Sequence, residues 1–444
     1  MKKKTILVSA LSLFMMVGVV SCGDDNEVIP NPNPGTETNY VKGTDTDGKT
    51  TYNKLLFDEN GNPDEKGIVI GNGEKEMVFK GKETLAKGTY LLKGWIYVAD
   101  GSELTIEAGT IIKGDKETQA CLIVEPGGKL IAKGTKEAPI VFTSEQPKGQ
   151  RKPGDWGGLI LCGNAKNNQG VQQIEGGPRT KHGGDNDADN SGILSYVRVE
   201  FAGYPFQKDK EINAITFGSV GNGTQVDHLQ VSFSNDDSYE WFGGCVNAKY
   251  LVAYSGWDDD FDTDNGFSGN VQYGLVVRYP RLADTSQSNG FESDNCADGA
   301  EVSPFTTATF SNITFIGPKA YDGFLNTNDY INGVEDYPNN GSSMGKFQSA
   351  MPYEDGKEYS FSHEYFINQP GNLVFDNCCD LLLKDARNVG AGYLPQSGSP
   401  VLNAAAWNDA ALSSFEKVDY VGAFGSDDQW LEGWTNFDPN HTDY

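Results

Sequence analysis

Three acidic turns in the middle of the chain carry the residues whose types and spacing most directly suggest chemistry. The turns are the stretches 235–241, 258–265 and 289–295. One carboxylate from each, Glu240, Asp264 and Glu292, recurs at intervals of 24 and 28 residues. If each interval is one coil of a repeating fold, carboxylates that are distant along the chain become neighbours in space.

Stacked carboxylates of this kind favour a bound cation. Neighbouring strands lie roughly 4.8 Å apart, and two unit charges at about that distance repel by about 1 kcal/mol in water. Ca²⁺ takes six to eight oxygen ligands, mostly carboxylates and carbonyls, so we expect at least one Ca²⁺ site here. Alternatively, the acids cap turns through Asx hydrogen bonds and face water separately. The candidate ligands are Asp236, Asp237, Glu240, Asp260, Asp262, Asp264, Glu292 and Asp294.

A second acidic stretch, 185–192, begins with the D-x-D-x-D pattern of a calcium loop. An EF-hand loop also needs a bidentate Glu at its twelfth position, and that position is Tyr196 here. We therefore expect a polar loop more than a calcium site.

The composition excludes several classes of partner. The chain has 444 residues and a formal charge of −27 at pH 7, so it repels DNA, RNA and anionic lipid, and no nucleic-acid partner is expected. A hydrophobic fraction of 37% with 54 glycines suits a solenoid with a thin core and many turns.

The N-terminus predicts export and lipidation. Lys2–Lys4 precede an apolar run over 5–20, and small residues then lead to Cys22, as in a signal peptide with a lipobox. We expect Cys22 to carry the lipid and the outer membrane to hold the protein; an ordinary signal peptide with a free thiol is the alternative. The acidic stretch 23–27 resembles the surface-export signal of Bacteroides-type lipoproteins, which implies that the body faces the cell exterior.

From residue 90 onward, short β-rich runs alternate with turns rich in Gly, Asp and Asn. Leu229, Leu251 and Leu275 lie in three strands that look equivalent, at intervals of 22 and 24 residues, within the range of known repeat periods. We predict a stack of coils in which each coil pairs with the next; a β-sandwich is the rival architecture.

The stretches 101–112 and 138–144 resemble the pectin-lyase-like family of parallel β-helices. Four further stretches together resemble a family of Bacteroidetes surface lipoproteins with that fold: 154–165, 196–203, 234–266 and 288–295. The resemblance implies an all-β, right-handed parallel β-helix. Because many family members occur beside TonB-dependent transporters, it also implies such a receptor as a partner.

The predicted organisation has six parts, with a loop-rich insertion and a C-terminal cap that includes Trp407, Phe415, Trp430, Trp434 and Phe437. They are a signal peptide (1–21), a lipidated cysteine and tether (22–50), an N-terminal lead-in (51–89), the β-helix core (90–317), the insertion (318–370), and final coils with the cap (371–444).

We expect a surface protein that binds an extracellular glycan or protein, with or without Ca²⁺ and with no organic cofactor. One alternative is a Ca²⁺-dependent polysaccharide lyase, which would need a basic side chain beside the metal. A structural or adhesion spacer is a further alternative. Aromatic and basic residues near the acidic turns are the candidate ligand-binding groups: Trp156, Tyr239, Trp241, Trp257, Arg278 and Arg281.

Overall fold

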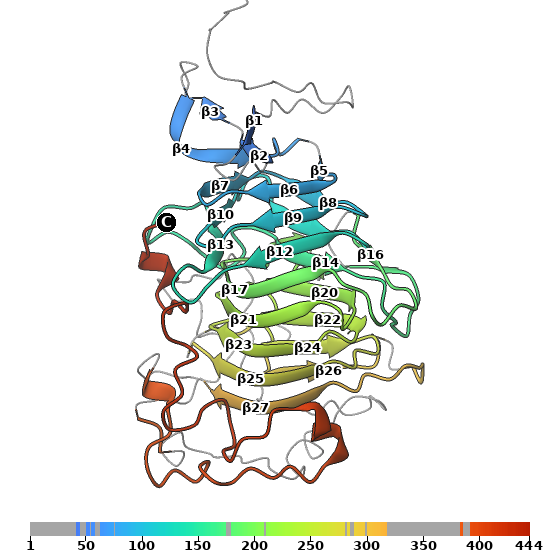
Figure 1. Cartoon of the computed structure of the whole chain (residues 1–444), viewed down its shortest axis with the longest axis vertical. Coiled ribbons are helices and arrows are strands. Elements are labelled where there is room, and N and C mark those ends of the chain that lie inside the picture. The colour runs from blue at the N-terminus through green and yellow to red at the C-terminus, as the bar shows by residue number, and fades with distance from the viewer. Residues whose placement is uncertain are drawn as a thin grey trace, which may run out of the picture.

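In the computed structural model the chain winds into a right-handed parallel β-helix, a column of coils stacked along one axis (Figure 1). The structure describes strands between residues 41 and 70, and then residues 71–317 apart from 75, 175–178, 208–209, 280–281, 285–287 and 298–299. It also describes residues 382–384 and 391–444. The signal peptide, Cys22, Arg281 and the predicted insertion lie outside these residues.

One wall of the column is a parallel sheet of eight short strands, here called sheet B. Its strands are β5 (Met77–Phe79), β8 (Trp95–Val98), β11 (Cys121–Val124), β14 (Gly158–Cys162), β20 (Ile215–Val220), β22 (Tyr239–Gly244), β24 (Phe261–Asp264) and β26 (Phe291–Ser293).

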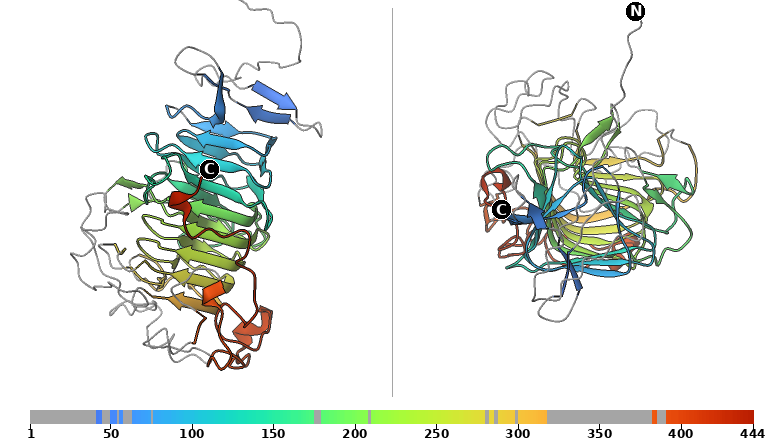
Figure 2. Two further views of the ribbon diagram at one scale, coloured as in Figure 1. Left: turned by 90° about the vertical axis from the view of Figure 1, so that its left-hand side faces the viewer. Right: turned by 90° about the horizontal axis from the view of Figure 1, so that it is seen from above.

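The other walls form a sheet of fifteen strands, here called sheet A, which wraps around a corner of the column (Figure 2). Its first strands are β1 (Val41–Thr44), β2 (Thr50–Asn53), β3 (Leu55–Phe57), β4 (Pro63–Ile70), β6 (Lys82–Leu85), β7 (Thr89–Leu92), β9 (Glu103–Ile106), β10 (Ile111–Gly114), β12 (Lys129–Lys133) and β13 (Ile140–Ser144). The later ones are β17 (Gly192–Glu200), β21 (Gln225–Ser232), β23 (Ala248–Tyr254), β25 (Asn270–Val277) and β27 (Thr309–Ile316).

The coil changes form at β17. This strand pairs with β12 through its first half and with β13 through its second half, so one long bent strand replaces two short ones. In this coil and in each later one that the structure describes, the bend is made by a residue with a positive φ, between 51° and 65°. These five residues, here called the bend column, are Tyr196, His228, Tyr250, Tyr273 and Asn312. The rings of the first four stack on one another; those of Tyr196 and His228, for example, have 4.2 Å between their centroids.

Inward side chains from both sheets fill one continuous core. Along sheet B, Tyr239 stacks on Phe261 with 5.7 Å between ring centroids, and Phe217 stacks on Trp241 at 5.6 Å. Like residues therefore form ladders, which the solenoid prediction requires.

The C-terminal residues 415–444, here called the strap, lie along the side of the column (Figure 1). The side chain of Gln272 forms two hydrogen bonds with the backbone of Glu416. Its Nε2 donates to the Glu416 carbonyl at 2.7 Å, and its Oε1 accepts from the Glu416 N–H at 3.0 Å. Gln230 does the same with Asn436, at 2.7 and 2.8 Å. Farther along, Arg151 donates to the Pro439 carbonyl at 2.6 Å.

The predicted parallel β-helix is confirmed and the β-sandwich is excluded. Leu229 pairs with Leu251, as expected, but Leu251 pairs with Gly274, one residue before the predicted Leu275. Within the strap, Trp434 packs its edge against Tyr196 of the bend column.

Three short 3-10 helices and two hairpins complete the described part. The 3-10 helices are η4 (Ala391–Tyr393), η5 (Ala410–Ser414) and η6 (Pro439–His441). The hairpins are β15 (Gln172–Gln173) with β16 (Lys181–His182), and β18 (Pro205–Gln207) with β19 (Lys210–Glu211).

Candidate acidic site on sheet B

Three carboxylates share one register position on successive strands of sheet B. Glu240 of β22 pairs with Asp262 of β24, and Asp262 pairs with Glu292 of β26. Their chain neighbours Tyr239, Trp241 and Phe261 are fully buried in the core, so the carboxylates lie on the outer face of the sheet. Glu240, Asp262 and Glu292 are here called the acidic column.

The predicted stack of Glu240, Asp264 and Glu292 was wrong in one member, Asp264. Asp264 pairs with Phe242, two residues beyond Glu240. A shift of two residues keeps a side chain on the same face of a strand. The expected common face is therefore correct, although Asp262 replaces Asp264 in the stack.

The turn before sheet B carries a second ladder, in which side-chain oxygens accept hydrogen bonds from the next coil. Asn213 Oδ1 accepts from the Asp237 amide at 3.2 Å, and Asp237 Oδ1 accepts from the Asp259 amide at 2.9 Å. Asp259 Oδ1 in turn accepts from the Asn289 amide. These bonds join successive coils and do not cap the aspartates' own turns, so Asp237 and Asp259 do not form the expected Asx caps. The second carboxylate oxygen of each is not used in these bonds.

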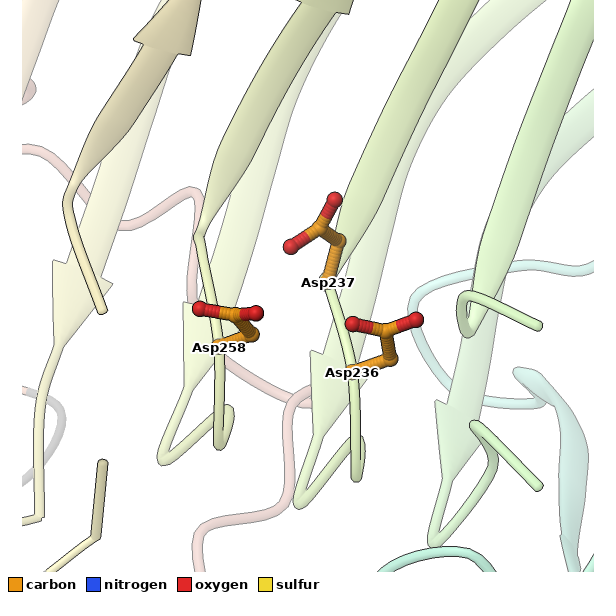
Figure 3. A group of neighbouring side chains, drawn as sticks. All are labelled: Asp236, Asp237 and Asp258. Atoms are coloured by element: carbon orange, nitrogen blue, oxygen red, sulfur yellow. The ribbon is translucent and has the colours of Figure 1, made fainter. Parts of the chain in front are cut away.

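Two groups of carboxylates meet around Asp237. The first is Asp236, Asp237 and Asp258, drawn from two successive turns (Figure 3), with one oxygen of each within 4.8 Å of the others. The second is Asp237, Glu240 and Asp262, within the same distance. Asp237 belongs to both groups and so joins the turn to the acidic column.

The acids at this site are held in an environment that opposes their charge. Burial, followed by repulsion from Asp236 and Asp262, raises the pKa of Asp237 well above its ordinary value. Burial and the neighbouring Glu240 and Glu292 do the same to the pKa of Asp262. Protons or a cation must therefore compensate the carboxylates when they lie together.

Two buried oxygens of this face have no hydrogen-bond partner among the described residues. One is Oδ1 of Asp262 and the other is Oγ1 of Thr216, which pairs with Glu240 in register and so continues the column by one strand. Asn213 Nδ2 donates to Glu240 Oε2. This donor set consists of hard oxygen atoms, the kind that Ca²⁺ prefers.

Asp260 is not part of the acidic column. It is fully buried in an ion pair with Arg278, with 3.3 Å between Oδ1 and Nη1. Burial raises the pKa of Asp260 to about 7, although Arg278 opposes the rise. Arg278 is itself fully buried and donates to the Trp257 and Asp258 carbonyls, so its assignment as a ligand-binding group was wrong.

The predicted aromatic platform is also absent from the surface. Trp156, Tyr239 and Trp241 are fully buried, and Trp257 is 2% exposed. The polar atoms of Trp156, Trp257 and Tyr239 bond to interior carbonyls; Tyr239 Oη, for example, donates to the Val252 carbonyl at 2.9 Å. These rings build ladders and cannot stack on a ligand.

The remaining predicted acids lie near the site but outside both carboxylate groups. Asp264 accepts a hydrogen bond from the Asn265 amide, and the Asp294 amide donates to the Thr263 carbonyl. Asp258, Asp259 and Thr216 were missed, although the two aspartates stood in an acidic turn already singled out.

The second acidic stretch is a hydrogen-bonded loop. Asp187 pairs with Lys166 at 2.8 Å, and Asp189 accepts from Asn164 and Ser191 at 3.3 Å. These side chains have protein partners, as expected for the polar-loop alternative.

The fold and this site define a parallel β-helix with an acidic outer face. The family model of the pectate-lyase-like β-helix domain matches residues 77–325, and the chain belongs to this family. No curated protein and no solved structure matches the chain. Among the described residues, no helix is both long and apolar enough to cross a membrane.

Proposed function

We propose that this chain is a surface binding protein that holds Ca²⁺ on the acidic column and uses it to bind an anionic glycan. The register that stacks Glu240, Asp262 and Glu292 carries the proposal. A stack of three outward carboxylates is unfavourable unless a cation or protons compensate it, and the buried Oδ1 of Asp262 offers a ligand atom without a competing protein donor.

The cation would lie near Asp237, Glu240 and Asp262, with Asp236 and Asp258 as further ligands. A Ca²⁺ ion bound there takes six to eight ligands, so part of its coordination is left for other oxygens. A glycan carboxylate could complete that shell. Without the cation the same ligand would be repelled by the negative face and by the net charge of −27.

Binding is favoured over catalysis by the state of Arg278, the one of the two candidate basic residues, Arg278 and Arg281, that the structure describes. Arg278 is buried and paired with Asp260, so it cannot remove a proton from a sugar on the outer face. A Ca²⁺-dependent lyase remains the alternative. Incubation with polygalacturonate and Ca²⁺ separates the two, because a lyase yields unsaturated products that absorb ultraviolet light.

The decisive experiment is Ca²⁺ titration of the protein and two matched variants by calorimetry. Asp262→Asn removes a charge from the middle of the column, and we expect it to weaken Ca²⁺ binding at least about tenfold, or about 1.4 kcal/mol. Asp264→Asn removes the same charge two residues away and should bind nearly as wild type. Equal affinity in all three proteins would contradict the site.

The proposed location is the outer face of the outer membrane, through a lipid on Cys22 and with a TonB-dependent receptor as partner. Cys22 stands where a lipobox places its modified residue. Cys22→Ser should abolish labelling by a radioactive fatty acid and release the protein from the membrane fraction. Protection of the wild-type protein from protease added to intact cells would contradict display on the cell exterior.

A further inference from the structure

A groove runs along sheet A on a different wall of the column from the acidic site. Its volume is about 480 Å³, within the range of about 300–1,000 Å³ typical of small-ligand sites. The lining residues that matter here are Gln225 and Asp227 of β21, Asn247 and Lys249 on the next coil, Asn270 of β25, and Phe415 of the strap. It is here called the side groove.

The floor of the side groove presents polar groups in a regular array. Asp227 pairs with Lys249 in register. Two residues earlier on the two coils lie the exposed side chains of Gln225, on β21, and Asn247, just before β23. Neighbouring strands are roughly 4.8 Å apart. A chain-like ligand lying along the column axis would therefore meet an equivalent polar position at each coil.

Asp227 is fixed as a charged hydrogen-bond acceptor. It accepts from Ser195 Oγ at 2.7 Å and from Gln225 Nε2 and His228 Nδ1 at 2.8 Å. Burial alone would raise its pKa, but these hydrogen bonds hold the pKa below its ordinary value. A carboxylate can accept about four hydrogen bonds, so one position remains for a ligand.

Asn247 supplies the complementary donor. Its Oδ1 accepts from the Asn270 amide at 3.0 Å, which orients the side chain. Its Nδ2 has no hydrogen-bond partner among the described residues, and the side chain is exposed. A donor therefore lies one coil away from the Asp227 acceptor.

The strap makes the wall of the groove rigid and electrically neutral. Glu416 is held by the double hydrogen bond to Gln272 and pairs with Lys249 at 3.4 Å. The adjacent Phe415 also lines the groove, but it is only 8% exposed. Because Lys249 and Glu416 offset each other, the unpaired charge of this floor is that of Asp227.

We propose that the side groove binds a neutral oligosaccharide without a metal. Donors and acceptors on neighbouring coils match a ligand that repeats hydroxyl groups along its length. An anionic glycan would face Asp227 and the negative net charge, so the groove and the acidic column select different sugars. The side groove is independent of the proposed Ca²⁺ site.

The test is calorimetry of the full-length protein in detergent with four neutral probes: cellohexaose, xylohexaose, maltohexaose and chitohexaose. We expect at least one to bind with a Kd below about 1 mM, unchanged by EDTA. Asn247→Trp places a bulky ring in the groove and should abolish this binding. Asp227→Asn should weaken it about tenfold, as loss of a charge-assisted hydrogen bond does.

Glu240→Gln is the control, because it alters the acidic column and leaves the groove intact. Asn247 is exposed, so its replacement should not change the thermal unfolding of the protein; if it does, Gln225→Ala, also at an exposed position, takes its place. Absence of binding by all four probes would overturn the proposal, as would binding that EDTA abolishes or that the groove variants leave unchanged. Loss of Ca²⁺ binding with neutral-sugar binding intact would overturn only the acidic site.

Discussion

At the residue scale, the acids around Asp237 are held close together although each one disfavours the charge of the next. Asp237, Asp259 and Asp262 all have pKa values raised well above the ordinary range, with burial as the largest cause. At pH values between the ordinary pKa of an aspartate and these raised pKa values, the folded protein without a cation still holds protons that the unfolded chain has released. Stability therefore falls as the pH rises through this interval.

The first prediction follows from competition between Ca²⁺ and these protons. In the proposed site Ca²⁺ would bind the ionised carboxylates, so its affinity should rise as the pH increases from about 5 to about 8. Thermal unfolding with EDTA should show a midpoint that falls over this range, and Ca²⁺ should restore it most at the higher pH. A Ca²⁺ effect of equal size at both ends of the range would contradict the raised pKa values.

The second prediction concerns His182, which is buried against Ser219, with 2.9 Å between Nδ1 and Oγ. Burial lowers the pKa of His182 from 6.5 to about 4. The unfolded chain takes up the proton first as the pH falls below 6.5, so this residue reduces stability progressively toward pH 4, by up to about 3 kcal/mol.

His182→Gln keeps a hydrogen-bonding side chain and removes this titration. The difference in free energy of unfolding between the variant and wild type should therefore shift in favour of the variant as the pH falls from about 6.5 to about 4. A difference that stays constant between these two pH values would rule out the buried neutral imidazole.

At the scale of elements, two glutamine side chains of the bent strands bond to the backbone of the strap, as a neighbouring strand would. Gln230 is fully buried and Gln272 is 1% exposed. Each forms hydrogen bonds with both the N–H and the C=O of one strap residue, Asn436 or Glu416. Their partners are 206 and 144 residues away in the chain. The strap is therefore part of the folded column.

The third prediction is that Gln230→Leu destabilises the protein. The change fills a similar volume but leaves the N–H and C=O of Asn436 without their partner, at a cost of about 1–3 kcal/mol for each buried group. Gln225→Leu, at an exposed position of the same strand, is the control and should change stability by less than about 0.5 kcal/mol. Chemical denaturation measures both, and equal effects would show that the strap contributes little.

The sequence was sufficient for the elements but not for all of their partners. Strand positions and the coil period could be predicted, because short apolar runs between turns recur at nearly constant spacing. The register of Glu240 could not, because the turns differ in length, so Asp262 follows after 22 residues and Glu292 after a further 30. The strap could not be predicted either, since contacts such as Gln230 with Asn436 leave no local pattern.

The error over the aromatic residues was avoidable at this same scale. Side chains alternate between the two faces of a strand. If Glu240 faces outward, Tyr239 and Trp241 must face the core, as they do. The sequence pattern therefore contained the information that excludes these two rings from a surface platform.

At the scale of the whole molecule, stability is close to a sum of contributions from each coil and its contacts with the next. The outer face of sheet B changes character along the column. The early coils carry apolar residues such as Ile123 and Ile160, which are fully buried, whereas β22, β24 and β26 carry the acidic column. A cation bound there would offset the repulsion between the stacked carboxylates of β22, β24 and β26.

The fourth prediction is therefore a local effect of Ca²⁺ on hydrogen exchange. In the proposed site Ca²⁺ would bind only the folded arrangement of Asp237, Glu240 and Asp262. At a concentration of about 100 times Kd it would stabilise that arrangement by about 2.7 kcal/mol. Amides of β20, β22, β24 and β26 should exchange more slowly with Ca²⁺ than with EDTA, while those of β8 and β11 should hardly change. Because adjacent coils share the repulsion, Asp262→Asn should itself slow exchange in EDTA and remove most of the response to Ca²⁺. Uniform slowing along the entire column would instead mean that the coils open together, and the Ca²⁺ effect could then not be assigned to the acidic column.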